Sequence, residues 1–164
     1  MDTVLKKVEP DHMHILKNLF EYYVYEFSAY IPTIAFQANG TFGYESFAKF
    51  FTEPGFFPYF IFADGKMAGF VVVQQANETG EHPCFLIKEF FVAKQFNGRG
   101  VGKKAAFLAF DLYKGNWIVT QIKPNLPAQA FWRKVIASYT NQNFTETIDE
   151  HNRIVQHFCN EKRV

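Results

Sequence analysis

A strand that runs through a glycine-rich turn into a helix constrains the fold of this chain more than any other feature. In the segment Lys88–Phe110, KEFFVAKQFNGRGVGKKAAFLAF, an apolar strand carries a carboxylate at Glu89, glycines follow at positions 98, 100 and 102, and a helical pattern begins. After Glu89 the segment holds four cations with no acid between them: Lys94, Arg99, Lys103 and Lys104. Such a turn gathers main-chain N–H groups at the positive end of a helix dipole. The pattern therefore predicts an anion-binding site, which we call the anion seat. The alternative is that the glycines only make a tight turn.

The two common nucleotide motifs do not fit this segment. A dinucleotide fingerprint, GxGxxG, needs a third glycine at position 103, and a P-loop counted from Gly98 needs its second glycine at the same place. That position is Lys103. The predicted anion seat therefore belongs to another class.

Length and composition indicate one globular domain spanning residues 1–164. Apolar residues make up 48% of the chain and aromatic residues 19%, with 21 phenylalanines, so we expect an aromatic core or pocket. Seventeen basic and sixteen acidic side chains leave a net charge of +1, which argues against a nucleic-acid binder with a broad basic surface.

Cysteine and histidine patterns give no metal motif. Cys84 and Cys159 lie far apart, outside any zinc spacing, and we expect reduced thiols. The first ten residues lack the apolar core of a signal peptide, and the longest apolar runs are too short to span a bilayer. We therefore expect a soluble, cytoplasmic protein with no metal and no membrane contact.

The remaining patterns predict the order β-α-α-β-β-β-α-β-α-β-β, a mixed α/β fold. Strands are expected at residues 3–8, 59–63, 68–74, 84–93, 117–122, 143–149 and 154–159, and helices from Asp11 through at least Tyr23 and at 44–51, 101–114 and 127–139. Asp11 is expected to cap the first helix. Asp64-Gly65 predicts a hairpin, and residues 76–83 a polar loop.

The third predicted helix should bury one stripe and end at a glycine. Its expected stripe is Val101, Ala105, Leu108 and Leu112, with Gly115 as the C-terminal cap.

Two motifs resemble those of the GNAT superfamily of N-acetyltransferases. FFVAKQFNGRGVGKKAA is similar to its acyl-CoA-binding pattern, Arg/Gln-x-x-Gly-x-Gly/Ala, in which Gly100 and Gly102 match and Asn97 replaces Arg or Gln. NLPAQAFWRKVI is similar to a second segment, Asn-x-x-Ala-x-x-Phe-Tyr-x-Lys. Its matching residues are Asn125, Ala128, Phe131 and Lys134, and Trp132 stands in place of the tyrosine. The resemblance implies a mostly antiparallel central sheet flanked by helices, and acetyl-CoA as cosubstrate.

The resemblance also implies where the cosubstrate lies. The diphosphate would be held by Asn97, Gly98, Arg99, Gly100, Val101, Gly102 and Lys103. The pantetheine arm would enter a gap between strands 84–93 and 117–122, where main-chain N–H groups of Phe91 and Val92 would face the thioester. Asn125 would bond the arm, or else be only a turn residue before Pro127, and Phe131 and Trp132 would line the site.

Glu89 is the candidate general base. An attacking amine must be neutral, although an alkyl ammonium has a pKa near ~10, and a carboxylate in an aromatic surround gains base strength through a raised pKa. The alternative is that Glu89 forms a structural ion pair with Lys88 or another cation.

The acid that protonates the leaving thiolate is the open part of the mechanism. Members of the family often use the tyrosine that Trp132 replaces, and an indole N–H is no useful acid. Tyr139, a water molecule or no group at all are the alternatives, since a thiol of pKa about ~8.5 is a tolerable leaving group.

The resemblance implies an acetyl-CoA-dependent N-acetyltransferase that acts on the primary amine of a small molecule by direct attack in a ternary complex. Its acceptor site would be built from the aromatic first two helices, the loop between them and the sheet edge. Two alternatives are an acyl-CoA-binding module that has lost catalysis and an enzyme that acetylates a protein or peptide amine. A homodimer is a further expectation from the resemblance.

Overall fold

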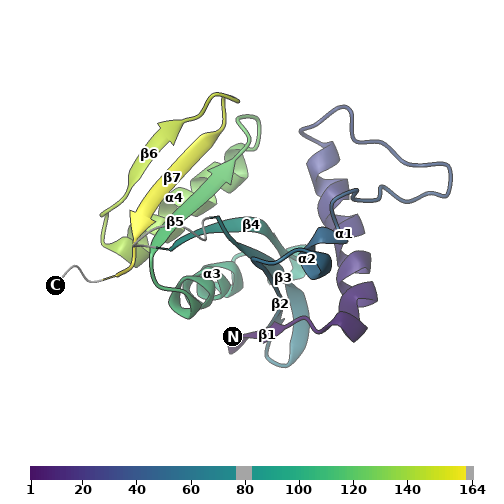
Figure 1. The fold of residues 1–164 in the computed structure, drawn as a ribbon, viewed down its shortest axis with the longest axis horizontal. Coiled ribbons are helices and arrows are strands. Elements are labelled where there is room, and N and C mark those ends of the chain that lie inside the picture. The colour runs from purple at the N-terminus through teal and green to yellow at the C-terminus, as the bar shows by residue number, and fades with distance from the viewer. Residues whose placement is uncertain (77–82, 162–164) are drawn as a thin grey trace.

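The computed structural model describes residues 1–76 and 83–161, which form one mixed sheet flanked by helices (Figure 1). The sheet has seven strands in the order β1-β2-β3-β4-β5-β7-β6. Along the chain the elements are β1 (Thr3–Lys7), η1 (Pro10–His12), α1 (Met13–Ser28), α2 (Lys49–Thr52), β2 (Phe56–Ala63), β3 (Lys66–Gln75), β4 (Cys84–Val92), η2 (Lys94–Phe96), α3 (Val101–Leu112), β5 (Asn116–Gln121), α4 (Leu126–Thr140), β6 (Thr145–Ile148) and β7 (Ile154–Cys159). The predicted order is confirmed, and among the strands of the described residues only β4 and β5 pair in parallel. The predicted loop at 76–83 lies largely outside the described residues.

Helices cover both faces of the central strands, which explains why β3 is almost continuously apolar. One face packs on α3 and α4 and includes Val71 and Val73, while the other packs on α1 and α2 and includes Phe70 and Val72. All four side chains are fully buried. Phenylalanines pack on both faces, and on the α1–α2 side Phe20 stacks on Phe70 with ring centroids 4.5 Å apart.

The buried stripe of α3 differs from the prediction. Leu108 and Leu112 are 36% and 52% exposed, whereas the buried face consists of Val101, Ala105, Ala106, Ala109 and Phe110. Apolar residues lie on both sides of this helix, so the helical period alone does not show which side is buried. The small alanines face inward, where they leave room for the large aromatic side chains Trp117 and Trp132 of the same core.

Three local predictions are wrong in detail. Asp11 lies in η1 and does not cap α1, which begins at Met13 without a side-chain cap. The second helix is only Lys49–Thr52. Gly115 is not the cap of α3, because Tyr113 already leaves the helix in an extended conformation. Instead, a Cβ on Gly115 would lie 2.3 Å from the carbonyl oxygen of Pro83, so glycine permits a close backbone approach.

Candidate active site

A β-bulge in β4 decides which way Glu89 points. In the β3–β4 register Val72 pairs with Glu89 and Val73 with Ile87, which leaves Lys88 as an extra residue. The extra residue reverses the alternation of side chains. Phe85 and Ile87 therefore face the α3–α4 core, whereas Phe91 belongs to the core under α1. Glu89, two residues before Phe91, is turned toward α1 and the segment that follows it.

The Glu89 carboxylate is held by two tyrosine hydroxyls. Its side chain is 7% exposed. Tyr23 of α1 donates to Oε2 at 2.6 Å, and Tyr44, from the segment between α1 and α2, donates to Oε1 at 2.5 Å. Lys88 at the bulge is exposed and acts on the carboxylate through its charge. The carboxylate is thus bound by the uncharged hydroxyl groups of two aromatic side chains, and not by an ion pair with Lys88.

Burial controls the ionisation of this cluster. Burial raises the pKa of Glu89 above its ordinary value, and this effect outweighs the lowering by the two tyrosine hydrogen bonds and by the charge of Lys88. The pKa of Tyr23 and that of Tyr44 are raised by burial and by the nearby Glu89 charge. Both tyrosines therefore remain hydrogen-bond donors at neutral pH, while the carboxyl becomes a stronger base than an exposed glutamate.

β4 and β5 diverge beyond their paired residues (Figure 1). Their parallel pairing runs from Cys84 with Asn116 to Ile87 with Val119 and stops there. Beyond that point β5 continues against β7 alone. Phe91 and Val92 lie on the part of β4 that β5 leaves unpaired, as the resemblance implied.

The glycine turn has the backbone of an anion seat. Gly98 and Gly100 have φ of +72° and +78°, a region that side chains rarely adopt, and a Cβ on either would meet open space. Gly100 precedes the first residue of α3, Val101, and provides no side-chain cap. The first helical bond is that of the Lys104 N–H with the Gly100 carbonyl, at 3.0 Å. The N–H groups of residues 101–103 thus have no partner inside the helix.

The cations of this segment are less available than their count suggests. Lys94 pairs with Glu26 of α1 at 3.7 Å, and Lys104 donates to the Met1 carbonyl at 2.8 Å. Lys103 lies over the Phe107 ring, 5.3 Å from its centroid. Asn97 and Arg99 are exposed beside the main-chain amides of the turn.

The second motif places aromatic rings against the start of α3. A Cβ on Gly102 would lie 3.1 Å from the Phe131 ring, so this glycine makes room for it. Trp132 is 5% exposed and packs edge-on against Phe90 with centroids 5.0 Å apart. Asn125 caps α4, because its Oδ1 accepts from the Ala128 N–H at 3.1 Å. That bond accounts for Asn125 structurally, and its contact with a cosubstrate stays a prediction.

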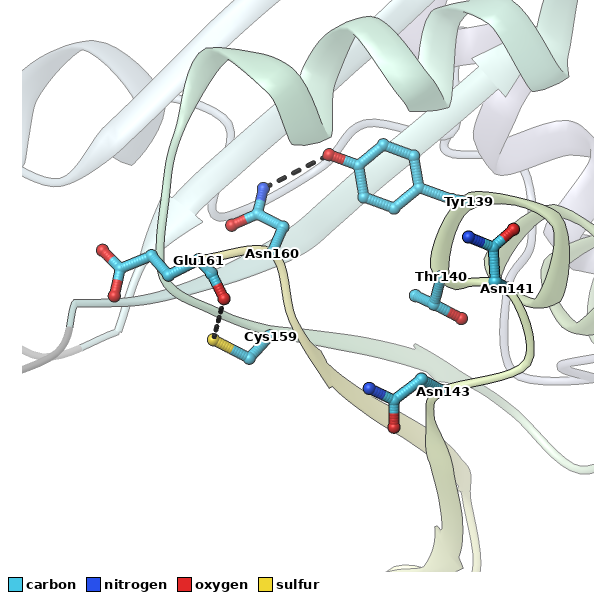
Figure 2. Close-up of a pocket in the computed structure, with 7 residues that line it drawn as sticks. All are labelled: Tyr139, Thr140, Asn141, Asn143, Cys159, Asn160 and Glu161. Atoms are coloured by element: carbon cyan, nitrogen blue, oxygen red, sulfur yellow. Dashed lines mark hydrogen bonds between the residues drawn. The ribbon is translucent and has the colours of Figure 1, made fainter. Parts of the chain in front are cut away.

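Tyr139 lies away from this site. Its hydroxyl donates to Asp111 at 2.8 Å near the C-terminal end of α3, and burial raises its pKa to about 12. Ten residues of helix, or about 15 Å, separate Asp111 from Val101. Figure 2 shows the hollow of about 260 Å³ on that side, where Asn160 donates to the Tyr139 hydroxyl. Tyr139 is therefore not placed to protonate a thiolate in the β4–β5 gap.

Sequence reasoning did not find the partners of Glu89. Tyr23 is an apolar-face residue of a helix by its spacing, and Tyr44 was assigned to a second helix. Each is distant from Glu89 along the chain, and no spacing rule joins them to it. The alternation of β4 gave no signal of the bulge either.

The chain combines a mixed sheet, whose two parallel strands diverge, with a helix that begins at a glycine turn. Residues 16–136 match the sequence model of the Acetyltransferase (GNAT) family, so the chain belongs to this family and is an acetyltransferase. No curated protein sequence matches the chain.

Solved structures agree on the fold. The chain is similar to an acetyltransferase from Thermus thermophilus, with a TM-score of 0.68, 14% identity and 97% of each chain covered. It is also similar to aminoglycoside acetyltransferase AAC(6')-Ib in complex with coenzyme A, with a TM-score of 0.62, 11% identity and 97% and 95% covered. Naa50 of Arabidopsis thaliana, in complex with the bisubstrate analogue CoA-Ac-MVNAL, has a TM-score of 0.63 at 13% identity, with 96% and 99% covered.

A metal-binding cluster and a membrane-spanning helix are features of other classes of protein. Residues 1–76 and 83–161 contain no group of three or more His, Cys, Asp or Glu side chains arranged to hold a metal ion. Among the same residues, no helix has the length and apolar character needed to cross a bilayer.

Proposed function

We propose that this acetyltransferase moves the acetyl group of acetyl-CoA to the primary amine of a small molecule by direct attack in a ternary complex. Acetyl-CoA as cosubstrate is supported by the family and by the CoA complexes of similar structures. The observation that carries the proposal is the position of Glu89. A buried carboxylate with a raised pKa faces the α1 side of β4 at the strand's unpaired end, beside the gap proposed for the thioester.

The residues around the gap supply binding and orientation. Main-chain amides of Asn97–Lys103 hold the diphosphate, with Arg99 adding charge at the surface. The pantetheine arm lies between the diverging strands, where it takes the place of a neighbouring strand. N–H groups of Phe91 and Val92 bond the oxyanion that develops during attack. The aromatic side chains of Phe131 and Trp132 pack against the pantetheine arm on the α4 side, and Asn125 forms a hydrogen bond with it.

Glu89 removes the proton that the amine must lose. An alkyl ammonium has a pKa of about 10.4, so most of it is charged at neutral pH and cannot attack. Glu89 accepts this proton directly or through one water. The nitrogen then forms its bond to the carbonyl carbon, the C–S bond breaks, and the second proton that the nitrogen must lose passes to water or to the departing thiolate. Because the thiol has a pKa of about 8.5, its thiolate leaves without a side-chain acid, consistent with Trp132 in the position of the usual tyrosine.

The acceptor side favours a compact amine. Tyr23, Phe27, Tyr44 and Phe91 put aromatic rings around or next to Glu89, and Glu26 adds a carboxylate at the surface. Aromatic walls with a carboxylate suit an amine with an apolar or cationic body. We also propose a cytoplasmic location and a homodimer, which fractionation and light scattering test.

Thiol release from acetyl-CoA with a panel of amines and peptides tests the proposal. We expect CoA thiol to appear with one or more small primary amines, and much less with peptides of any N-terminal sequence. Release that occurs only with peptides would replace the small-molecule acceptor by a protein or peptide. Calorimetric binding of CoA without release for any acceptor would indicate a binding module that has lost catalysis.

A further inference from the structure

Glu21 of α1 holds the segment that leads to Tyr44. The connection between α1 and α2, residues 29–48, extends beyond the end of α1 and returns to its side (Figure 1). Where it returns, the Glu21 carboxylate accepts from two successive amides, the Phe42 N–H at 2.6 Å and the Gly43 N–H at 3.0 Å. Both oxygens are used, so this short stretch of backbone is fixed against the helix.

The backbone conformation favours glycine at the second of these amides. Gly43 has φ of +69°, and a Cβ there would lie 2.6 Å from Nε2 of Gln37. The positive φ lets two successive N–H groups converge on one carboxylate. The connection is thus built to present this pair of donors to Glu21.

Tyr44 follows immediately and reaches Glu89. Its ring lies against Phe20 and Phe50, with centroid distances of 5.2 and 6.0 Å, and its hydroxyl donates to Oε1 of Glu89. An unbroken set of contacts therefore runs from Glu21, through two amides, to Tyr44 and Glu89. Tyr23, on α1 itself, holds the other oxygen.

We propose that Tyr44 is a positioning residue for Glu89 and that Glu21 sets the place of Tyr44 by binding the two amides before it. This inference rests on the proposed function, in which Glu89 is the base. The two tyrosines fix the plane of the carboxylate, and each oxygen keeps a second lone pair for an amine or a water. The connection that borders the acceptor site is thereby coupled to the base.

Among residues 1–76 and 83–161, three side chains act on the charge of Glu89. α1 contributes Tyr23, the connection contributes Tyr44, and β4 contributes the charge of Lys88. The β3 partner of Glu89 is apolar Val72. A donor to the charged carboxylate lowers its pKa, so removing either hydroxyl raises that pKa further. A change that only loosened the packing would admit water and lower the pKa of Glu89, which is the opposite direction.

The titration of Glu89, followed by carboxyl NMR in protein labelled with ¹³C at the glutamate side chain, tests the coupling. The Glu89 signal is assigned by its loss in Glu89→Gln. We expect Tyr44→Phe to raise the titration midpoint by about one pH unit, a tenfold change in the acid constant. Glu21→Gln keeps one acceptor oxygen and should give about half that rise. Tyr22→Phe and Glu45→Gln, at exposed neighbours, should leave the midpoint in place.

A double variant separates coupling from independent effects. If Glu21 acts only through Tyr44, Glu21→Gln combined with Tyr44→Phe titrates like Tyr44→Phe alone. An unmoved midpoint in a folded Tyr44→Phe protein overturns the role of Tyr44. Additive shifts in the double variant overturn the role of Glu21.

Kinetics with an active acceptor give an independent reading. In Tyr44→Phe the acidic limb of the pH profile of kcat should shift to higher pH by the same amount as the NMR midpoint. The affinity for CoA should stay at the wild-type value. The NMR experiment needs no turnover. A wild-type protein that releases no thiol therefore contradicts the proposed function, whereas an unmoved midpoint contradicts the coupling.

Discussion

Gly100→Ala is the variant that most directly tests the anion seat. At φ of +78° an L-residue costs about 1 kcal/mol of folding free energy, although a Cβ there meets no protein atom within 4 Å. For a chain of this size we expect a fall in Tm of about 2–4 °C. The same Cβ would project into open space, where the proposed function places the diphosphate. Loss of one hydrogen bond from an amide to a charged oxygen, about 1.5–3 kcal/mol, weakens CoA binding about ten- to a hundredfold.

Gly65→Ala is the matched control for that variant. Gly65 has φ of +75°, and its added Cβ likewise has no neighbour within 4 Å, but it lies in the β2–β3 turn. Both variants should lose the same stability by thermal unfolding, and only Gly100→Ala should lose CoA affinity by calorimetry. Equal CoA affinity in the two variants would show that the diphosphate does not lie on this turn.

Three other substitutions test Glu89 as the general base, the need for a thiolate-protonating acid at position 132, and the close backbone approach at Gly69 in the sheet. Glu89→Gln should lower kcat by ~10²-fold or more at neutral pH with CoA affinity retained, and wild-type kcat with an unchanged pH profile would exclude Glu89 as the base. The raised pKa of Glu89 stabilises the fold below the unfolded pKa, and this stability is lost as pH rises through the folded pKa. Denaturant unfolding should therefore show Glu89→Gln gaining stability relative to wild type between pH 4 and pH 8, and a constant difference would contradict burial as the dominant effect. Trp132→Tyr should speed the chemical step severalfold in single-turnover assays if the acid was lost, and no gain would mean that none is needed. Gly69→Ala would put a Cβ 1.9 Å from the Phe91 carbonyl oxygen and should cost about 3 kcal/mol or more, measured by the same unfolding; wild-type stability would refute the close approach.

Local signals predicted most of the architecture. The Asp64-Gly65 hairpin forms as expected, with φ of 47° and 75° at its two residues. The glycine turn and the capped start of α4 at Asn125 are also where their motifs indicate. Each of these features depends on a few neighbouring residues, because backbone conformation at turns and helix starts is set by local sterics and hydrogen bonds.

Patterns that admit two solutions were resolved only by packing. Leu108 and Leu112 are apolar and correctly spaced, yet the sheet meets the alanine side of α3. The helical period shows that α3 has an apolar face, but the sheet on which the helix packs determines which of its faces is buried. The aromatic rings of Trp117 and Trp132 fill the space that the alanines leave.

The sequence by itself determined the family, the element order and the position of the glycine turn, because motifs and turns are encoded over a few residues. Tertiary structure alone decided what surrounds Glu89. The bulge at Lys88 appears only in the register between β3 and β4, and it reverses the face to which the carboxylate points. Its partners, Tyr23 and Tyr44, lie 66 and 45 residues away along the chain. Strand register and contacts at such separation arise from packing of the whole core, so no local pattern contains them.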